Sequence, residues 1–307
     1  MSDPITVTHV HGDRIRVASG GTELLAYVYR PDPDPYESRK PYAHPLRTLA
    51  GHVVTGYRPN DHRWHKGLQM TASHLSGQNF WGGNSYLGPD QGYQRVPERV
   101  GSMRHDGFEK LDVTAERLSF TERLSWLSHH GEHWCDERRE ITAHSVDATA
   151  GAWALDWSIH LTNVRAEPLR FGSPTTAGRE LAGYTGLHWR GPRDFNEGTV
   201  LAGGGLTGEG ATMGQQAPWL SFSTLHDEVD ASSTLVFAHA PENVDAIHAS
   251  HWFVREQPTP TVAFSWAFHD EFELPPGECF AYRYRVIIAD GAWDAERTER
   301  HLKGIPW

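Results

Sequence analysis

The chain has 307 residues, of which 38% are hydrophobic and 12 are tryptophan, which is ample material for a buried core. Its formal charge of −11 argues against a nucleic-acid or an anionic-membrane partner, because both require a basic protein face. No apolar run approaches the length of a transmembrane helix, and the N-terminus lacks the features of a signal peptide, so we expect a cytoplasmic protein with no membrane partner.

Alternating apolar and polar residues predict strands throughout the chain, because successive side chains on a strand point to opposite faces. The candidate strands before residue 150 are 5–9, 13–18, 23–29, 51–55, 66–72, 118–127 and 137–144. The candidates after it are 153–161, 169–173, 219–224, 233–239, 262–268 and 280–288. The pattern is clearest where one face would carry Trp153, Leu155, Trp157, Ile159 and Leu161.

A Pro-Pro-Gly turn signal at 275–277 separates the last two candidate strands, so we expect residues 261–289 to form an antiparallel hairpin. One helix is predicted, over residues 292–303 at the C-terminus. Many strands and few helices predict an all-β fold, a large antiparallel β-sandwich with a short C-terminal helix. Since no repeat or linker divides the chain, we expect residues 1–307 to form a single β-sandwich domain.

The segment 41–86 is the strongest candidate for a functional site, because it combines many histidines with large aromatic residues. Imidazole can act as an acid, a base or a metal ligand near neutral pH, and aromatic faces bind sugar rings. His62 and His65 are three residues apart, which suits two metal ligands, acid/base or hydrogen-bonding groups in a pocket, or simply surface or packed histidines. Expected substrate-binding residues in this segment are His44, Arg47, Lys66 and Trp81.

A second cluster combines Arg179 and Glu180 with the segment 186–195. An Arg–carboxylate pair near Trp and His suits the binding of sugar hydroxyls or of an anionic substrate group. The alternative is a structural salt bridge at a strand end. Glu180 is the expected carboxylate partner of the catalytic histidines, with Asp194 in reserve. The expected substrate-binding residues of this cluster are Trp189, Arg190 and Asp194.

A third cluster contains His239, Asn243 and Trp252. Directly after a predicted strand, His239 and Asn243 are placed to line the mouth of a cleft, with Trp252 as a wall on which a sugar stacks. The alternative is a loop capped by Asn243 and a Trp252 buried in the core. No nucleophile elbow and no dinucleotide-binding fingerprint occurs in the sequence.

Several motifs resemble a bacterial family usually labelled PmoA-like, a domain of unknown function. The matching elements are His44-Pro-Leu-Arg-Thr48, Asp61-His-Arg-Trp-His-Lys-Gly-Leu68, Gly183-Tyr-Thr-Gly-Leu187 with Trp189-Arg190, and His239-Ala-Pro-Glu-Asn243 followed by Trp252-Phe253. The most specific element is the motif that begins at Asp61, in which Trp64 stands where the family often has His. That departure weakens a metal site built on three successive histidines.

The family resemblance implies a galactose-mutarotase-like β-supersandwich that acts on sugars. In such sandwiches, histidines and a carboxylate on the concave face perform acid/base work at an anomeric carbon. The period-two strands agree with this architecture independently of the resemblance.

Together these features predict a carbohydrate-active enzyme that performs acid/base chemistry on a sugar or an oxidised (3-keto) glycoside, such as epimerisation or glycosidic cleavage. The expected catalytic residues are His62, His65 and Glu180. We expect no cofactor and a small-molecule carbohydrate partner; a homo-oligomer is compatible with the sequence. One alternative is a hydrolase or lyase that binds a divalent metal through His62 and His65, and another is a non-catalytic sugar-binding protein.

Overall fold

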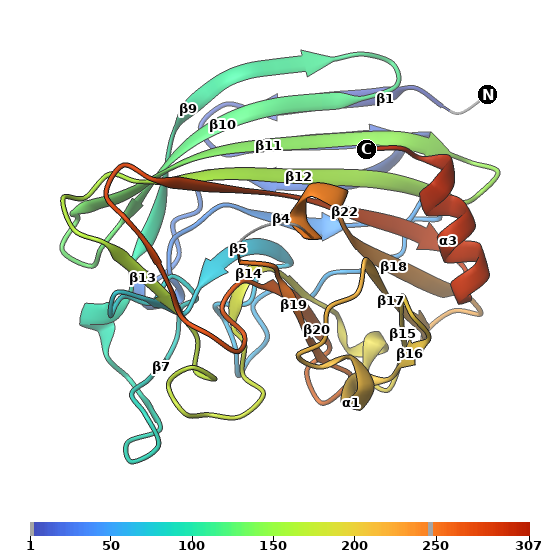
Figure 1. The fold of residues 1–307 in the computed structure, drawn as a ribbon. Coiled ribbons are helices and arrows are strands. Elements are labelled where there is room, and N and C mark those ends of the chain that lie inside the picture. Colours follow the sequence, from blue (N-terminus) through green and yellow to red (C-terminus); the bar gives the residue numbers. More distant parts are fainter. Residues whose placement is uncertain (1–2, 245–247) are drawn as a thin grey trace.

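The computed structural model describes residues 3–244 and 248–307 and shows two large β-sheets (Figure 1). Within these described residues, the eight strands of the first sheet are ordered β1 (Ile5–Val10), β2 (Arg14–Ser19), β3 (Thr22–Val28), β4 (Tyr42–Leu46), β5 (Leu68–Ala72), β14 (Thr185–Arg190), β20 (Thr261–Ser265) and β19 (His251–Arg255). Its neighbouring strands pair antiparallel.

The second sheet contains the longest strands of the molecule, which form the upper layer in Figure 1. Over the same described ranges, its nine strands are ordered β16 (Leu206–Thr207), β15 (Thr199–Ala202), β17 (Trp219–Leu225), β18 (Ser232–His239), β22 (Cys279–Asp290), β12 (Ala152–Asn163), β11 (His133–Asp147), β10 (Leu118–Leu127) and β9 (Ser102–Val113). These strands also pair antiparallel.

Smaller elements complete the fold. A three-stranded sheet is ordered β21 (Phe272–Leu274), β13 (Leu169–Gly172) and β6 (His74–Leu75), and a two-stranded sheet pairs β7 (Ser85–Tyr86) with β8 (Tyr93–Gln94). The α-helices are α1 (Glu209–Thr212), α2 (Pro241–Val244) and α3 (Ala295–Gly304), and 3-10 helices span Pro35–Glu37, Pro97–Arg99 and Arg193–Phe195. None of the helices in the described ranges is long and apolar enough to cross a membrane.

The alternating pattern of β12 builds the core between the sheets. Trp153, Trp157 and their alternate neighbours on this strand are at most 2% exposed, and Trp157 pairs with Tyr284 of β22. The intervening His160 is exposed. Because each buried aromatic ring removes a large apolar area from water, these positions contribute strongly to the stability of the sandwich.

Helix α3 explains why the middle strand β22 is buried on both of its faces. Its N-cap is Asp294, whose side chain accepts a 2.7 Å hydrogen bond from the Arg297 amide. Trp293, just before the helix, packs with Ile287 and Ala289 of β22 in a second apolar cluster. The charged residues of α3 lie on the solvent side, at the edge of the molecule that is red in Figure 1.

A buried network of charges lies inside the sandwich. Arg139 donates to both carboxylate oxygens of Glu137, at 2.7 and 2.9 Å, and to the hydroxyl of Tyr27 at 3.0 Å. Tyr27 in turn donates to Glu122, whose other oxygen lies 2.6 Å from Nδ1 of His105. Each of these charged groups therefore has a hydrogen-bonding partner, as buried ions require.

The prediction of an all-β, antiparallel sandwich with a short C-terminal helix is confirmed by these sheets and by α3. Most of the predicted strands are present. The additional strands that the pattern did not indicate are β4, β6, β7, β8, β9, β14, β15, β16, β19 and β21. The organisation of residues 1–307 as a single domain stays a prediction.

Two strand predictions are wrong. Residues 51–55 form no strand, and Val53 makes only an isolated bridge with Arg47. Residues 261–289 form no hairpin, because β20 pairs with β14 and β19 in the first sheet, whereas β22 pairs with β12 and β18 in the second. The chain turns after Ser265 and passes through β21 of the small sheet, which carries it from one layer to the other.

Candidate functional site

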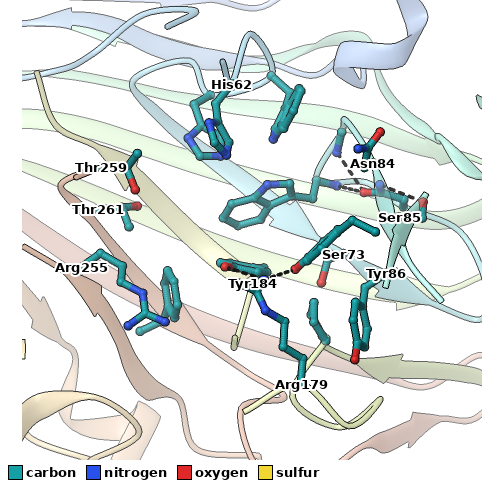
Figure 2. A pocket seen from close by; sticks show the side chains of 18 of the residues that line it. His62, Ser73, Asn84, Ser85, Tyr86, Arg179, Tyr184, Arg255, Thr259 and Thr261 are labelled. Atoms are coloured by element: carbon teal, nitrogen blue, oxygen red, sulfur yellow. Dashed lines mark hydrogen bonds between the residues drawn. The ribbon is translucent and has the colours of Figure 1, made fainter. Parts of the chain in front are cut away.

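A cleft of about 720 Å³ lies beside the β5, β14, β20 and β19 edge of the first sheet and contains most of the chemistry-bearing side chains discussed below. Figure 2 shows His62 at one side of it, Arg179 at another and Tyr184 between them. The aromatic lining residues are Trp64, Trp81, Tyr86, Tyr93, Tyr184 and Phe253. The polar lining includes Asp61, His62, His65, His74, Ser73, Asn79, Asn84, Arg179, Glu209, Arg255, Thr259 and Thr261. Aromatic faces combined with a few convergent polar groups are typical of small-molecule sites.

Two successive turns bring the paired histidines to the cleft. The His62 amide donates to the Pro59 carbonyl at 3.0 Å, and the His65 amide donates to the His62 carbonyl at 2.9 Å. The two imidazole rings consequently lie with centroids 4.9 Å apart. Gly67 ends this turn with a φ of +61°, and a Cβ there would stand 2.2 Å from the Ala43 carbonyl oxygen, so only glycine fits.

Trp81 forms the aromatic centre of the cleft. A turn fixes it in place, because Oδ1 of Asn79 accepts from the Trp81 amide at 2.9 Å and Nζ of the buried Lys40 donates to its carbonyl at 2.8 Å. Its ring centroid is 5.4 Å from that of His65 and 5.0 Å from that of Tyr184. Trp81 therefore connects the histidine side of the cleft to the tyrosine side.

His65 is a buried, neutral histidine of the cleft. It is only 6% exposed, and burial, together with the nearby His188 and His62 rings, holds its pKa well below the usual range. Neither of its ring nitrogens has a partner among the described residues. Since buried polar atoms are normally hydrogen-bonded, an imidazole left open beside a cleft suggests an interaction with a ligand.

His188 supports His65 from behind, with ring centroids 4.9 Å apart. The Thr261 hydroxyl donates to the Trp189 carbonyl at 2.8 Å, so it accepts from Nε2 of His188 at 2.6 Å. The proton of the neutral ring is then on Nε2, and Nδ1 is an open acceptor. Burial, with Arg190 close by, keeps the pKa of His188 well below its usual range, which preserves this tautomer.

Asp61 is the carboxylate of the histidine side. Its oxygen lies 2.8 Å from Nδ1 of His62, without the alignment of a hydrogen bond. Burial raises the pKa of Asp61, but His62, the backbone and Arg190 outweigh it, so the net effect is a lowered pKa and an ionised carboxylate at neutral pH.

The opposite side of the cleft carries two arginines. Nη1 of Arg179 donates to the hydroxyls of Tyr184, at 3.1 Å, and Tyr93. Arg255 instead forms an ion pair with Glu209 and donates to the Leu181 carbonyl at 2.9 Å.

The structure does not bring several expected residues to the cleft. Glu180 is exposed and does not line it, so Asp61 is the carboxylate beside the histidines. His44 lies 2.9 Å from the Thr55 hydroxyl outside the cleft, and burial, with Arg47 nearby, lowers its pKa to about 4. Arg47 is half-buried and does not line the cleft; its carbonyl accepts a hydrogen bond from the core residue Trp153.

Lys66, Arg190 and Asp194 also lie outside the cleft lining. Burial lowers the pKa of Lys66 to about 8, although Glu37 stands 3.2 Å from its ammonium and opposes that change. Arg190 is buried behind the histidines, and its Nη1 has no partner in the part of the chain that is described. Asp194 lies 2.9 Å from Nδ1 of His226.

The third predicted cluster is packed into the sandwich rather than into the cleft. Trp189 and Trp252 are fully buried. His239 packs against Trp252, and burial lowers its pKa to about 3. Asn243 exchanges hydrogen bonds of 2.6 and 3.0 Å with the Arg283 backbone. The alternative of a capping Asn243 and a buried Trp252 is therefore what the structure contains.

Among the expected residues, His62, His65 and Trp81 line one cleft. Sequence reasoning missed His188, although a signal existed: on a strand, His188 shares a face with Arg190, while Trp189 points the other way into the core. Tyr184 stands in the family motif that begins at Gly183, but no role was expected of it, and the structure places it in the cleft lining.

No group of three or more His, Cys, Asp or Glu side chains within residues 3–244 and 248–307 is arranged to hold a metal ion.

The fold and the cleft define an antiparallel β-sandwich protein with a site rich in histidine and aromatic residues. Residues 14–303 match the model of a family described as a "Family of unknown function (DUF6807)", and the chain belongs to that family. A search of curated proteins gives no match.

Solved structures similar to this chain include two epimerase-type proteins. Galactose 1-epimerase from Lactobacillus acidophilus NCFM is 10% identical, with a TM-score of 0.41, and the match covers 94% of this chain and 98% of the epimerase. The GalM/aldose epimerase homologue from C. elegans is 9% identical, with a TM-score of 0.36, covering 95% and 100%.

A third similar structure is heparan sulfate lyase HepC from Pedobacter heparinus, at 8% identity and a TM-score of 0.41. The match covers 94% of this chain, which spans only 35% of the length of the lyase. At such identities and TM-scores, none of these likenesses bears on what this chain binds or does.

Proposed function

We propose that the cleft binds a carbohydrate and that its histidines perform acid/base chemistry on it, as in an epimerase or mutarotase, or in a glycoside hydrolase or lyase. An oxidised (3-keto) glycoside is one suitable substrate, because a carbonyl acidifies the neighbouring C–H bond that a general base would attack.

The observation that carries this proposal is the state of His65. It is buried, neutral at physiological pH, without a partner in the described structure at either ring nitrogen, and part of the cleft lining. A neutral imidazole is the form that accepts a proton, and within hydrogen-bonding reach of a substrate it acts as a general base.

His62 and Asp61 supply the second half of the chemistry. A proton on Nδ1 of His62 is attracted to the Asp61 carboxylate 2.8 Å away, which leaves Nε2 as the nitrogen that exchanges protons with substrate. In this proposal Asp61 replaces Glu180 as the partner carboxylate. Trp81 is 7% exposed and lines the cleft next to His65 and Tyr184, so its exposed edge gives a sugar ring an apolar contact.

The test is time-resolved proton NMR of the protein with aldoses, glycosides and their 3-keto derivatives. We expect accelerated anomer or epimer exchange, or bond cleavage, and a loss of roughly 10²- to 10⁴-fold in rate for His65→Gln. His44→Gln is the matched control, since His44 is also largely buried with a lowered pKa but lies outside the cleft. Equal rates in His65→Gln and His44→Gln would reject the catalytic role of His65.

A non-catalytic sugar-binding protein is the second candidate, favoured by the aromatic lining. It would bind sugars without turnover, and His65→Gln would leave that binding unchanged. The metal-dependent alternative predicts stoichiometric zinc, manganese or iron on the purified protein and a rate that falls when a chelator is added.

Three narrower expectations belong to the same proposal: kinship with the PmoA-like family, a cytoplasmic location, and a carbohydrate as the physiological partner. The oligomeric state is open, and light scattering of the purified chain measures it.

A further inference from the structure

We propose that the sugar bound in the cleft carries a carboxylate, as in a uronic acid, and that Arg179 binds it. This inference rests on the proposed function and narrows its substrate class. It follows from how differently the two cleft arginines are bonded.

Arg179 is a cation that the protein leaves uncompensated. No carboxylate in the described ranges forms an ion pair with it, and its hydrogen bonds come only from Nη1, to the Tyr93 and Tyr184 hydroxyls. Phenols are neutral at pH 7, so they orient the guanidinium without offsetting its charge. Nε and Nη2 have no partner among the described residues and together form one edge of the guanidinium fork.

Arg255 provides the internal comparison. Its charge is paired with Glu209, whose second oxygen accepts from the Glu256 amide at 2.9 Å, and its Nη2 donates to the Leu181 carbonyl. These contacts neutralise Arg255 and fix it as part of the cleft wall. The same cleft therefore contains one arginine bonded as a structural group and one with a free donor edge.

The position of Arg179 is fixed before any ligand arrives. Its guanidinium carbon lies 4.9 Å from the centroid of the Tyr93 ring and 5.7 Å from that of Tyr184. Tyr184 in turn contacts Trp81, whose ring contacts His65. A sugar in contact with Trp81 would thus lie between the proposed base and a pre-oriented cation, which lowers the ordering cost of binding.

Charge and shape both favour a carboxylate. The chain has a formal charge of −11, so its overall field repels anions, and an anionic ligand needs a local cation to bind. Two parallel N–H donors on one edge of a guanidinium match the two oxygens of a planar carboxylate. A neutral sugar would leave this charge without a counterion inside the cleft.

The experiment is isothermal titration at low salt with the methyl glycosides of glucuronate and galacturonate, their neutral methyl esters, and the methyl glycosides of glucose and galactose. We expect the uronates to bind roughly 10- to 100-fold more tightly than the neutral sugars, the range given by a charge-assisted hydrogen bond. Arg179→Gln should remove this preference, so that uronates and neutral sugars bind with similar affinity, and Arg179→Lys should restore part of it through charge alone.

Arg170→Gln is the matched control, because Arg170 is an arginine outside this cleft with its own ion pair to Glu273 at 3.1 Å; it should keep the full preference. Thermal unfolding confirms that each variant is folded. If neutral sugars bind the wild type as tightly as uronates, this inference fails while the proposed function stands. If no sugar of either kind binds, the proposed function fails with it. Tighter, Arg179-dependent binding of glucose 6-sulfate would overturn the assignment of a carboxylate.

Discussion

The charge network inside the sandwich and the histidine side of the cleft both bury polar side chains, but they treat them in opposite ways. In the network, Arg139 and Glu137 form two hydrogen bonds with each other, and Glu122 accepts from both Tyr27 and His105. In the cleft, His65 has no partner at either nitrogen among the described residues. The difference separates polar groups that hold a structure together from groups that are left available for a ligand.

The largest expected effect breaks the network. Arg139→Met should lower the free energy of unfolding by about 3–5 kcal/mol, because it leaves the buried Glu137 carboxylate without its counterion. Chemical denaturation followed by tryptophan fluorescence measures this. The matched control is Arg138→Met on the same strand, whose exposed ion pair with Glu109 should be worth no more than about 1 kcal/mol.

The double variant Arg139→Met/Glu137→Gln should be more stable than Arg139→Met alone, since it removes the uncompensated charge. A loss in Arg139→Met equal to that in Arg138→Met would show that the buried network does not stabilise the fold.

A pH titration extends the comparison to His239, which does not line the cleft and has no hydrogen-bonding partner for its ring nitrogens among the described residues. His239 has a native pKa of about 3, lowered by burial, against an unfolded value of about 6.5. Its contribution to stability is complete above pH 6.5 and is lost as the pH falls towards 3, because the unfolded chain takes up the proton first.

As the pH falls from 6.5 to 5, His239 should lower the free energy of unfolding of the wild type by at most about 2 kcal/mol. The His239→Phe variant should lose less free energy of unfolding than the wild type over the same range, by that amount. Denaturation curves at pH 7, 6 and 5 provide the measurement. Parallel pH profiles for the wild type and His239→Phe would mean that His239 can be protonated within the folded protein.

The smallest expected effect compares two buried histidines directly. His65→Leu should change the free energy of unfolding by about 1 kcal/mol or less in either direction, because it breaks no hydrogen bond within the described protein. His105→Leu should cost about 1–3 kcal/mol, since it takes a partner from the buried Glu122. A larger loss in His65→Leu than in His105→Leu would mean that His65 is structural.

The sequence predicted where the strands lie better than it predicted which strands pair in the sheets. Period-two alternation identifies β12 and β22 because each has one face in the core. It contains no information on which strands pair, so two alternating segments on either side of a Pro-Pro-Gly turn suggested a hairpin although β20 and β22 belong to different sheets. The turn in fact lies between β21 and β22.

The sequence predicted the part of the site whose residues lie close together in the chain. His62 and His65 share one pair of turns, and Trp81 follows a short distance later, so a single rich segment indicated them. His239 and Trp252 also combine a histidine with a tryptophan, but they are packed in the interior. The residue types alone cannot distinguish a packed ring from one that faces a cleft. Arg179 was named with Glu180, yet only the arginine reaches the cleft.

The lining of the cleft is divided between two kinds of backbone. Thr261 and Phe253 belong to paired strands of the first sheet, whereas His65, Trp81 and Arg179 lie on connecting segments outside any strand. Substitutions in the connecting segments can therefore change ligand selectivity without breaking inter-strand hydrogen bonds. If the cleft binds a sugar as proposed, selection for a new sugar in a mutant library would act first on those segments, and the paired strands would keep the fold unchanged.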